Sequence, residues 1–284
     1  MPPQQERHFA SLSPHGFHRV AYRQWGDPDN PRVVVCVHGL TRNGRDFDAL
    51  AAAIGDRFRV LCPDMPGRGD SEWLADPNDY TFPTYLTTLT ALLAHTSVER
   101  CAWVGTSMGG LLGMVLAAQR NTPVVRLVVN DVGPVIESPA LARIASYVGA
   151  DPQFESFAAL EAHIRAVSAP FGALSDSQWQ TLAQTTARQV RDGSWRLKYD
   201  PGIAVPFRVQ AAQKGDLWPV WDAISCPTLV LRGAESDLLA AETAAAMRVR
   251  GPKPRLIEWA GIGHAPMLLD AEQIAPVADF LDAM

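Results

Sequence analysis

The sequence has few cysteines and no long apolar run, and both absences narrow the class of protein. The 284 residues include four cysteines, Cys36, Cys62, Cys101 and Cys226, and no two of them are close in the sequence. Each falls at or within a run that resembles a buried strand. We therefore predict small core residues in a reducing compartment, with no disulfide and no metal site. No uninterrupted apolar segment approaches the roughly 18 residues that a membrane span needs, so we expect no membrane partner.

A strong charge of either sign is also missing. The net charge is −5, 19% of the residues are charged, and no basic run is present. This balance argues against a nucleic-acid partner. The first six residues show neither a basic start nor an apolar core of a signal peptide, so we expect a cytoplasmic protein, either a monomer or a homodimer. The length and the 47% hydrophobic content suit one large globular domain, with room for an inserted subdomain.

Apolar, often β-branched runs alternate with segments of helical spacing over most of the chain. The runs expected to form buried strands are residues 33–37, 58–61, 101–104, 124–129, 227–232 and 255–259. Continuous runs of this kind are typical of strands covered on both faces. The sequence therefore predicts an α/β fold, with a mostly parallel central sheet and helices on both faces.

The alternation stops between residue 133 and about Lys214. Apolar residues at helical spacing recur there, the last set being Trp179, Leu182 and Val190, and proline and glycine interrupt them repeatedly. We predict an inserted helical cap over residues 133–215. The α/β core would then consist of residues 1–132 and 216–284.

One short stretch has the pattern of a nucleophile. Gly105-Thr106-Ser107-Met108-Gly109 lies between an apolar run and a helix-forming run, as in a strand–turn–helix elbow that exposes a serine. A Cβ at either glycine would collide where strand and helix cross, and the serine should adopt strained backbone geometry. Ser107 is thus the candidate nucleophile.

A serine hydroxyl needs a base and an orienting carboxylate. His264 follows the last expected strand in a glycine loop, whereas His163, the other histidine after the elbow, lies within a predicted cap helix. His264 is the candidate base. Asp237 and Asp131 each follow a strand and open at the same edge of the sheet. We prefer Asp237, which matches the commoner position of the acid beside such an elbow, and keep Asp131 as the alternative.

Acyl chemistry also needs donors for an oxyanion. The elbow offers the backbone N–H of Met108, and the loop after residues 33–37 offers the N–H of Leu40, with Gly39 permitting close approach. His38 is expected to hold this loop in place and to take no part in acid–base chemistry.

Taken in order, these motifs resemble an α/β-hydrolase-fold protein of the cap-bearing type, over nearly the whole chain. They are His38-Gly39, residues 64–71 (DMPGRGDS), the elbow, Asp237 and Gly263-His264. The resemblance implies a Ser-His-Asp triad with no metal or organic cofactor. A serine at the elbow argues against epoxide hydrolases and haloalkane dehalogenases, which carry an aspartate there.

The expected function is hydrolysis of a small-molecule carboxylic ester through an acyl-enzyme on Ser107. The alternatives are a lactonase or a carbon–carbon bond hydrolase, although the latter usually has a tryptophan after the histidine where this chain has Ala265. A non-catalytic ligand-binding homologue is a further alternative. Four side chains are candidates for the substrate pocket: Arg42, Trp195, Phe207 and Trp218.

Overall fold

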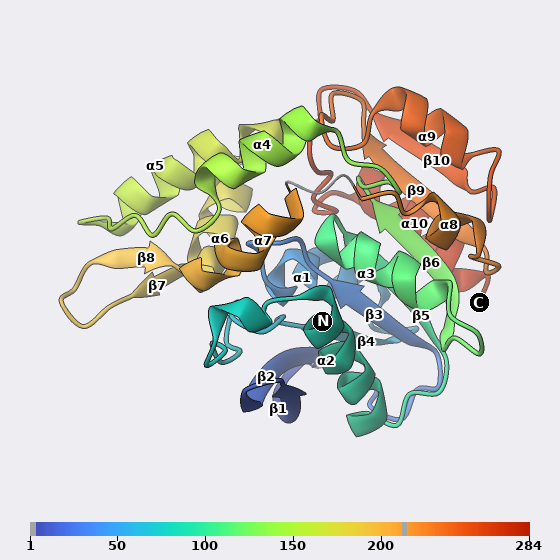
Figure 1. Cartoon of the computed structure of the whole chain (residues 1–284), viewed down its shortest axis with the longest axis horizontal. Helices are drawn as coiled ribbons and strands as arrows, with labels where there is room; N and C mark the ends of the chain where they lie inside the picture. The colour runs from blue at the N-terminus through green and yellow to red at the C-terminus, as the bar shows by residue number, and fades with distance from the viewer. Residues whose placement is uncertain (1–3, 212–214) are drawn as a thin grey trace.

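The computed structural model describes residues 4–211 and 215–284, and the described chain is built around a sheet of eight strands (Figure 1). Their order across the sheet is β1-β2-β4-β3-β5-β6-β9-β10. β2 runs antiparallel to both of its neighbours, and the remaining pairs are parallel. The strands are β1 (Gln4–Ser13), β2 (Gly16–Trp25), β3 (Val33–Val37), β4 (Arg59–Pro63), β5 (Cys101–Thr106), β6 (Val124–Asn130), β9 (Thr228–Gly233) and β10 (Arg255–Trp259).

Helices cover both faces of the sheet because the central strands are apolar on both sides. In β3, Val35 packs into one hydrophobic cluster and its neighbours Val34 and Cys36 pack into another, as the two-residue period of a strand requires. The first cluster is closed by α2 (Phe82–His95), α3 (Met108–Ala117), α8 (Trp218–Asp222) and α9 (Ala241–Met247), and the second by α1 (Asp48–Ile54) and α10 (Ala271–Asp282). The predicted α/β fold with a mostly parallel sheet is confirmed.

Most of the chain between β6 and β9 forms a separate layer, at the left of Figure 1. Its helices α5 and α6 share a small apolar cluster that includes Leu160, Ile164 and Trp179. A hairpin of two short strands follows α6. The elements of this segment are α4 (Ser138–Tyr147), α5 (Phe157–Val167), α6 (Asp176–Thr186), β7 (Ala187–Gln189), β8 (Trp195–Leu197) and α7 (Ala204–Ala211), followed by α8.

One part of the helical expectation for this segment was wrong. Val190 does not continue a helix with Trp179 and Leu182, because α6 ends at Thr186 and the chain turns into the β7–β8 hairpin. Gly193, with a φ of +85°, lies in the turn between the two strands, where side-chain-bearing residues are strained.

The division into a core of residues 1–132 and 216–284 and a cap of residues 133–215 stays a prediction, and Lys214, where we expected the cap to end, lies outside the described residues. Four short 3₁₀ helices complete the described elements: Gly44–Phe47, Pro77–Asp79, Ala169–Phe171 and Pro201–Ile203. Within residues 4–211 and 215–284, no helix is both long and apolar enough to cross a membrane.

Candidate active site

The predicted strand–turn–helix elbow is present, with Ser107 at the turn between β5 and α3. Its φ of +53° lies in the left-handed region, which costs free energy for a residue with a side chain. A Cβ on Gly105 would collide with the carbonyl of Gly109, and a Cβ on Gly109 would collide with the carbonyl of Val37. The two glycines therefore permit α3 to pack directly against β5 and β3.

His264 lies in the loop after β10 and reaches Ser107 across the end of the sheet. Its Nε2 is 3.0 Å from Ser107 Oγ, and its Nδ1 is 2.7 Å from Asp131 Oδ2. The side chain is 14% exposed, so one edge of the imidazole faces a cavity. With the proton on Nδ1, this ring can accept the hydroxyl proton of Ser107.

The carboxylate beside His264 belongs to Asp131, the residue directly after β6. Its side chain is fully buried and has three hydrogen-bonding neighbours. The N–H of Gly233 donates to Oδ1 at 3.0 Å, and the hydroxyl of Ser236 donates to Oδ2 at 2.7 Å, beside the imidazole. A carboxylate with this many donors is held in a single orientation.

The prediction that Asp237 accompanies His264 was wrong. Asp237 points outward, is 47% exposed and forms a bidentate ion pair with Arg143 of α4, at 2.6 and 2.8 Å. That hydrogen bonding lowers the pKa of the Asp237 carboxyl. The loop after β9 instead turns Ser236 inward, so this loop supplies donors to the acid in place of the acid itself.

The loop after β3 is fixed by His38, as expected. Its Nδ1–H donates to the carbonyl of Gly39 at 2.7 Å, and its Nε2 accepts from the N–H of Met65 at 2.9 Å. Complete burial lowers the pKa of His38 to about 3, so the ring is neutral. Within the described chain, the backbone N–H groups of Leu40 and Met108 donate to no protein acceptor, which leaves both available for an oxyanion.

Arg68, part of the motif at residues 64–71 but given no role by the sequence, supports the same loop from the other side. Its guanidinium is fully buried; Nε donates to the carbonyl of Leu40 at 2.8 Å and Nη1 to the hydroxyl of Tyr85 at 2.8 Å. The guanidinium also lies 5.0 Å from the centre of the Tyr85 ring. Within the described chain no carboxylate pairs with it, so Arg68 is a buried cation close to the oxyanion loop.

Two further residues beside the triad also went unrecognised in the sequence. Ser236 directly precedes Asp237, the aspartate that we preferred, and Asn130 directly precedes Asp131, the alternative. The side-chain amide of Asn130 donates to Thr106 Oγ1 at 3.0 Å and to the carbonyl of Pro266 at 2.8 Å. It thereby ties the elbow strand to the loop that carries His264. A single serine in a loop and a single asparagine at the end of a strand carry no pattern that could have indicated these contacts.

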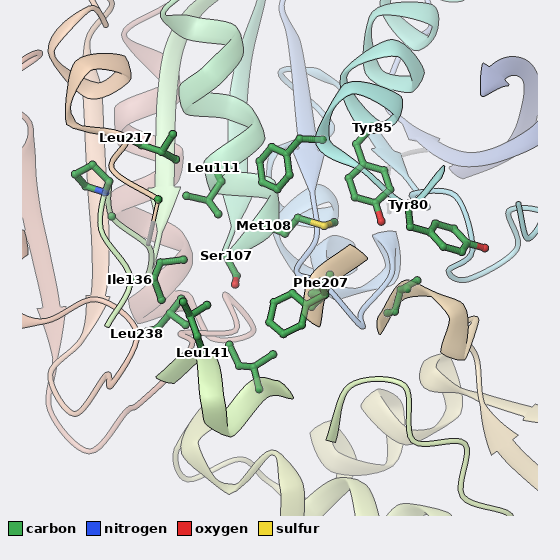
Figure 2. Close-up of a pocket in the computed structure, with 17 residues that line it drawn as sticks. Tyr80, Tyr85, Ser107, Met108, Leu111, Ile136, Leu141, Phe207, Leu217 and Leu238 are labelled. Carbon is green, nitrogen blue, oxygen red and sulfur yellow. The ribbon is translucent and has the colours of Figure 1, made fainter. Parts of the chain in front are cut away.

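Ser107 lies on the wall of two cavities. The larger, of about 300 Å³, is lined mainly by apolar side chains, including Phe207, and the Ser107 hydroxyl points into it (Figure 2). The smaller, of about 160 Å³, is lined in part by His264 and Arg42. Arg42 is already neutralised, because Asp46 accepts from its Nε and Nη2 at 2.9 and 2.6 Å. Two of the four pocket candidates thus line a cavity at Ser107.

The two tryptophans proposed for the pocket line neither of these cavities. Trp195 packs edge-on against Phe157, with ring centroids 5.3 Å apart, inside the layer formed by α5 and the hairpin. Trp218 lies under the guanidinium of Arg250, 4.0 Å from the ring centre, while its neighbour Leu217 faces the larger cavity.

Among residues 4–211 and 215–284, no three histidine, cysteine or acidic side chains cluster so as to hold a metal ion.

The sequence matches a family model described as "Alpha/beta hydrolase family" over residues 34–279. It is also 47% identical over 277 residues to a 3-hydroxybutyrate-oligomer hydrolase of Cupriavidus necator, covering 95% of this chain and 94% of that protein. An esterase of Mycobacterium tuberculosis is 28% identical over 81% of this chain and 75% of its own.

Solved structures agree with this match. An alpha/beta hydrolase from Novosphingobium aromaticivorans superposes with a TM-score of 0.90 at 39% identity, covering all of both chains. A putative hydrolase from Rickettsia typhi gives a TM-score of 0.91 at 29% identity, covering 99% of both. The chain therefore belongs to the α/β hydrolase family and is a hydrolase.

Proposed function

We propose that this hydrolase cleaves carboxylic esters with Ser107 as nucleophile, His264 as base and Asp131 as the orienting acid. The observation that carries the proposal is the continuous chain of contacts, 3.0 Å from Ser107 to His264 and 2.7 Å from His264 to Asp131. A nucleophile within hydrogen-bond reach of a base, itself oriented by a third group, is the geometry of covalent acyl transfer.

The reaction proceeds in two halves. Ser107 Oγ attacks the ester carbonyl while His264 Nε2 takes its proton, and the backbone N–H groups of Leu40 and Met108 hold the developing oxyanion. His264 then gives the proton to the departing alcohol, which leaves an acyl group on Ser107. Water, deprotonated by His264, attacks this acyl-enzyme and releases the acid, and the proton returns to Ser107.

The substrates that we propose first are short linear esters of hydroxy acids. The Cupriavidus relative acts on 3-hydroxybutyrate oligomers by name, and it shares 47% of its residues over nearly the full length of both chains. Such an oligomer is a chain of carboxylic esters, so the chemistry proposed for Ser107 is the chemistry that it requires. The largely apolar cavity at Ser107 suits the carbon skeleton of these esters.

The first experiment tests the nucleophile. Purified protein should react with a fluorophosphonate probe and hydrolyse 3-hydroxybutyrate dimer and trimer, with products followed by chromatography. Ser107→Ala should lose labelling and reduce kcat by about 10³-fold or more, because the covalent step disappears. Unchanged turnover in that variant would refute the proposed mechanism, and a wild-type protein without labelling or turnover would favour a ligand-binding role.

A substrate panel separates this proposal from its alternatives. Linear oligomers, a lactone and a ring-cleavage diketone can be compared by kcat/KM under identical conditions. We expect the linear esters to be the best substrates. A lactone or diketone preferred by more than about tenfold would assign the site to a lactonase or to a carbon–carbon bond hydrolase.

A further inference from the structure

The two cavities meet at Ser107 and share very little wall. Of the residues that line either one, Leu40, Ser107 and Ile144 alone border both in the described chain. Ile144 belongs to α4 and Leu40 to the loop after β3, so a helix and a loop border both cavities beside the nucleophile. Ser107 therefore faces two chambers, the larger of about 300 Å³ and the smaller of about 160 Å³, which can hold the two sides of a substrate.

His264 borders the smaller chamber and not the larger. In acyl transfer the protonated imidazole must reach the oxygen of the leaving group, since otherwise an alkoxide would have to depart. The leaving oxygen must therefore lie on the side of the carbonyl carbon that faces His264. The remaining substituent of the carbonyl, the acyl chain, then extends away from the imidazole.

We infer that the larger chamber binds the acyl chain and the smaller chamber binds the leaving alcohol, so that separate residues set the two specificities. The inference rests on the proposed ester hydrolysis at Ser107 and adds to it the orientation of the bound ester. When the ester C–O bond breaks, the acyl carbon stays bonded to Ser107 Oγ and faces the larger chamber. The alcohol, carrying the proton from His264, is left in the smaller one.

The linings of the chambers differ in the way that this assignment requires. The larger chamber is mostly aliphatic and aromatic; Figure 2 shows Ile136, Leu141 and Phe207 around the Ser107 hydroxyl. Its tyrosine hydroxyls are already engaged: Tyr80 donates to Asp200 at 2.5 Å, and Tyr85 accepts from Arg68. An acyl chain gains from such a wall through the apolar surface that it buries.

The smaller chamber has polar groups that a short alcohol can use. Arg42, Arg143, Thr41 and His163 border it, together with the carboxylate of Asp46. Arg42 and Arg143 each form a bidentate ion pair, so no isolated charge faces the chamber. A leaving group with a hydroxyl, a carbonyl or a solvated carboxylate fits this lining better than a long alkyl chain does.

The test uses two substrate series that vary one side of the ester at a time. One series holds ethanol fixed and lengthens the acid from acetate to octanoate; the other holds acetate fixed and lengthens the alcohol from methanol to hexanol. Two matched variants each add bulk to one chamber. Ile136→Phe changes a partly buried residue that borders the larger chamber alone, and Val167→Phe changes an exposed residue that borders the smaller alone.

We expect Ile136→Phe to lower kcat/KM for the longest acids by about tenfold relative to acetate, with the alcohol series unchanged. Val167→Phe should lower kcat/KM for the longest alcohols and leave the acid series unchanged. The opposite pattern would show the reverse assignment. A shift of both series by either variant would show that the chambers do not act separately, and unaltered profiles in both variants would also overturn the inference.

Two controls keep this result distinct from a failure of the proposed function. Fluorophosphonate labelling and thermal unfolding of each variant report whether the nucleophile and the fold are intact. Phe207→Ala enlarges the larger chamber and should move the best acid to a longer chain without affecting the alcohol series, which tests the inference if Ile136→Phe fails to fold. If the wild-type protein hydrolyses no ester in either series, the proposed function of Ser107 is refuted, and this result is distinct from a wrong assignment of the chambers.

Discussion

At the scale of single residues, the site depends on which of two aspartates turns toward His264. Asp131 has a φ of +56°, and this left-handed backbone directs its carboxylate inward, where Gly233 and Ser236 donate to it. Asp237 lies in the loop after β9, directly before the buried Leu238, and faces Arg143. The two carboxylates stand at the same edge of the sheet and differ in their surroundings, since Asp131 is buried among donors and Asp237 is largely exposed.

The aspartates give a matched pair of substitutions. Asp131→Asn should reduce kcat by about 10⁴-fold, because an amide beside Nδ1 no longer favours the tautomer that accepts the proton of Ser107. Asp237→Asn should change kcat little, since it removes an exposed ion pair with Arg143. Steady-state kinetics on one linear ester compares them directly. Similar losses in the two variants, or a larger loss at Asp237, would contradict the assignment of Asp131.

Sequence alone indicated Ser107 and His264 but preferred Asp237 to Asp131, the aspartate that lies beside His264, for a physical reason. A serine between two glycines, and a histidine between the last strand and the last helix, are restricted by the chain geometry around them. The acid can come from either strand end, and the choice is made by a single φ and by two loop donors. Those depend on packing between segments that are about a hundred residues apart, Asp131 and Gly233 among them.

At the scale of elements, the loop after β3 connects the sheet to the candidate oxyanion site. His38 ties this loop to Met65, in the loop after β4, and Arg68 from the same second loop holds the carbonyl of Leu40. Both side chains are fully buried. The sequence predicted the structural role of His38 from its position before Gly39, whereas the contribution of Arg68 depends on the two loops meeting in space.

The buried His38 makes the stability of this loop depend on pH. Its pKa falls from 6.5 in a free chain to about 3 in the fold, chiefly through desolvation. Below pH 6.5 the unfolded chain therefore takes up a proton that the folded chain does not. Folding then loses free energy as the pH falls from 6.5 toward 3, by roughly 3 kcal/mol at about pH 4.5.

Urea unfolding at a series of pH values measures this effect. His38→Gln keeps an acceptor for the N–H of Met65 and has no proton to gain, so its free energy of unfolding should fall less steeply with decreasing pH. The exposed His8→Gln serves as the control and should keep the wild-type slope. Equal slopes in the wild type and in His38→Gln would show that His38 is not the source.

At the scale of the whole molecule, the sheet was predictable and the layer above it only in part. Strands such as β3 and β6 bury both faces, so their apolar runs stand out in the sequence. Part of the segment between β6 and β9 packs into a small apolar cluster of its own, and the β7–β8 hairpin lies where we expected a helix. Short strands of three residues carry too little periodicity to be recognised.

At the same scale, the proposed assignment of the unequal chambers predicts from which end a 3-hydroxybutyrate oligomer is cleaved. In a linear 3-hydroxybutyrate trimer, the bond nearer the carboxyl end has two units on its acyl side and one on its alcohol side. This division matches the larger and the smaller chamber in turn. We expect units to be removed singly from the carboxyl end, with the hydroxyl end held on the enzyme.

An isotopically labelled trimer tests this direction. With the label in the carboxyl-terminal unit, the first product should be labelled monomer together with unlabelled dimer, as followed by mass spectrometry at early times. Labelled dimer with unlabelled monomer would mean that the oligomer is cleaved from its hydroxyl end. A hydrolase of this polarity would release the hydroxyl-terminal unit only when the last ester bond is cut.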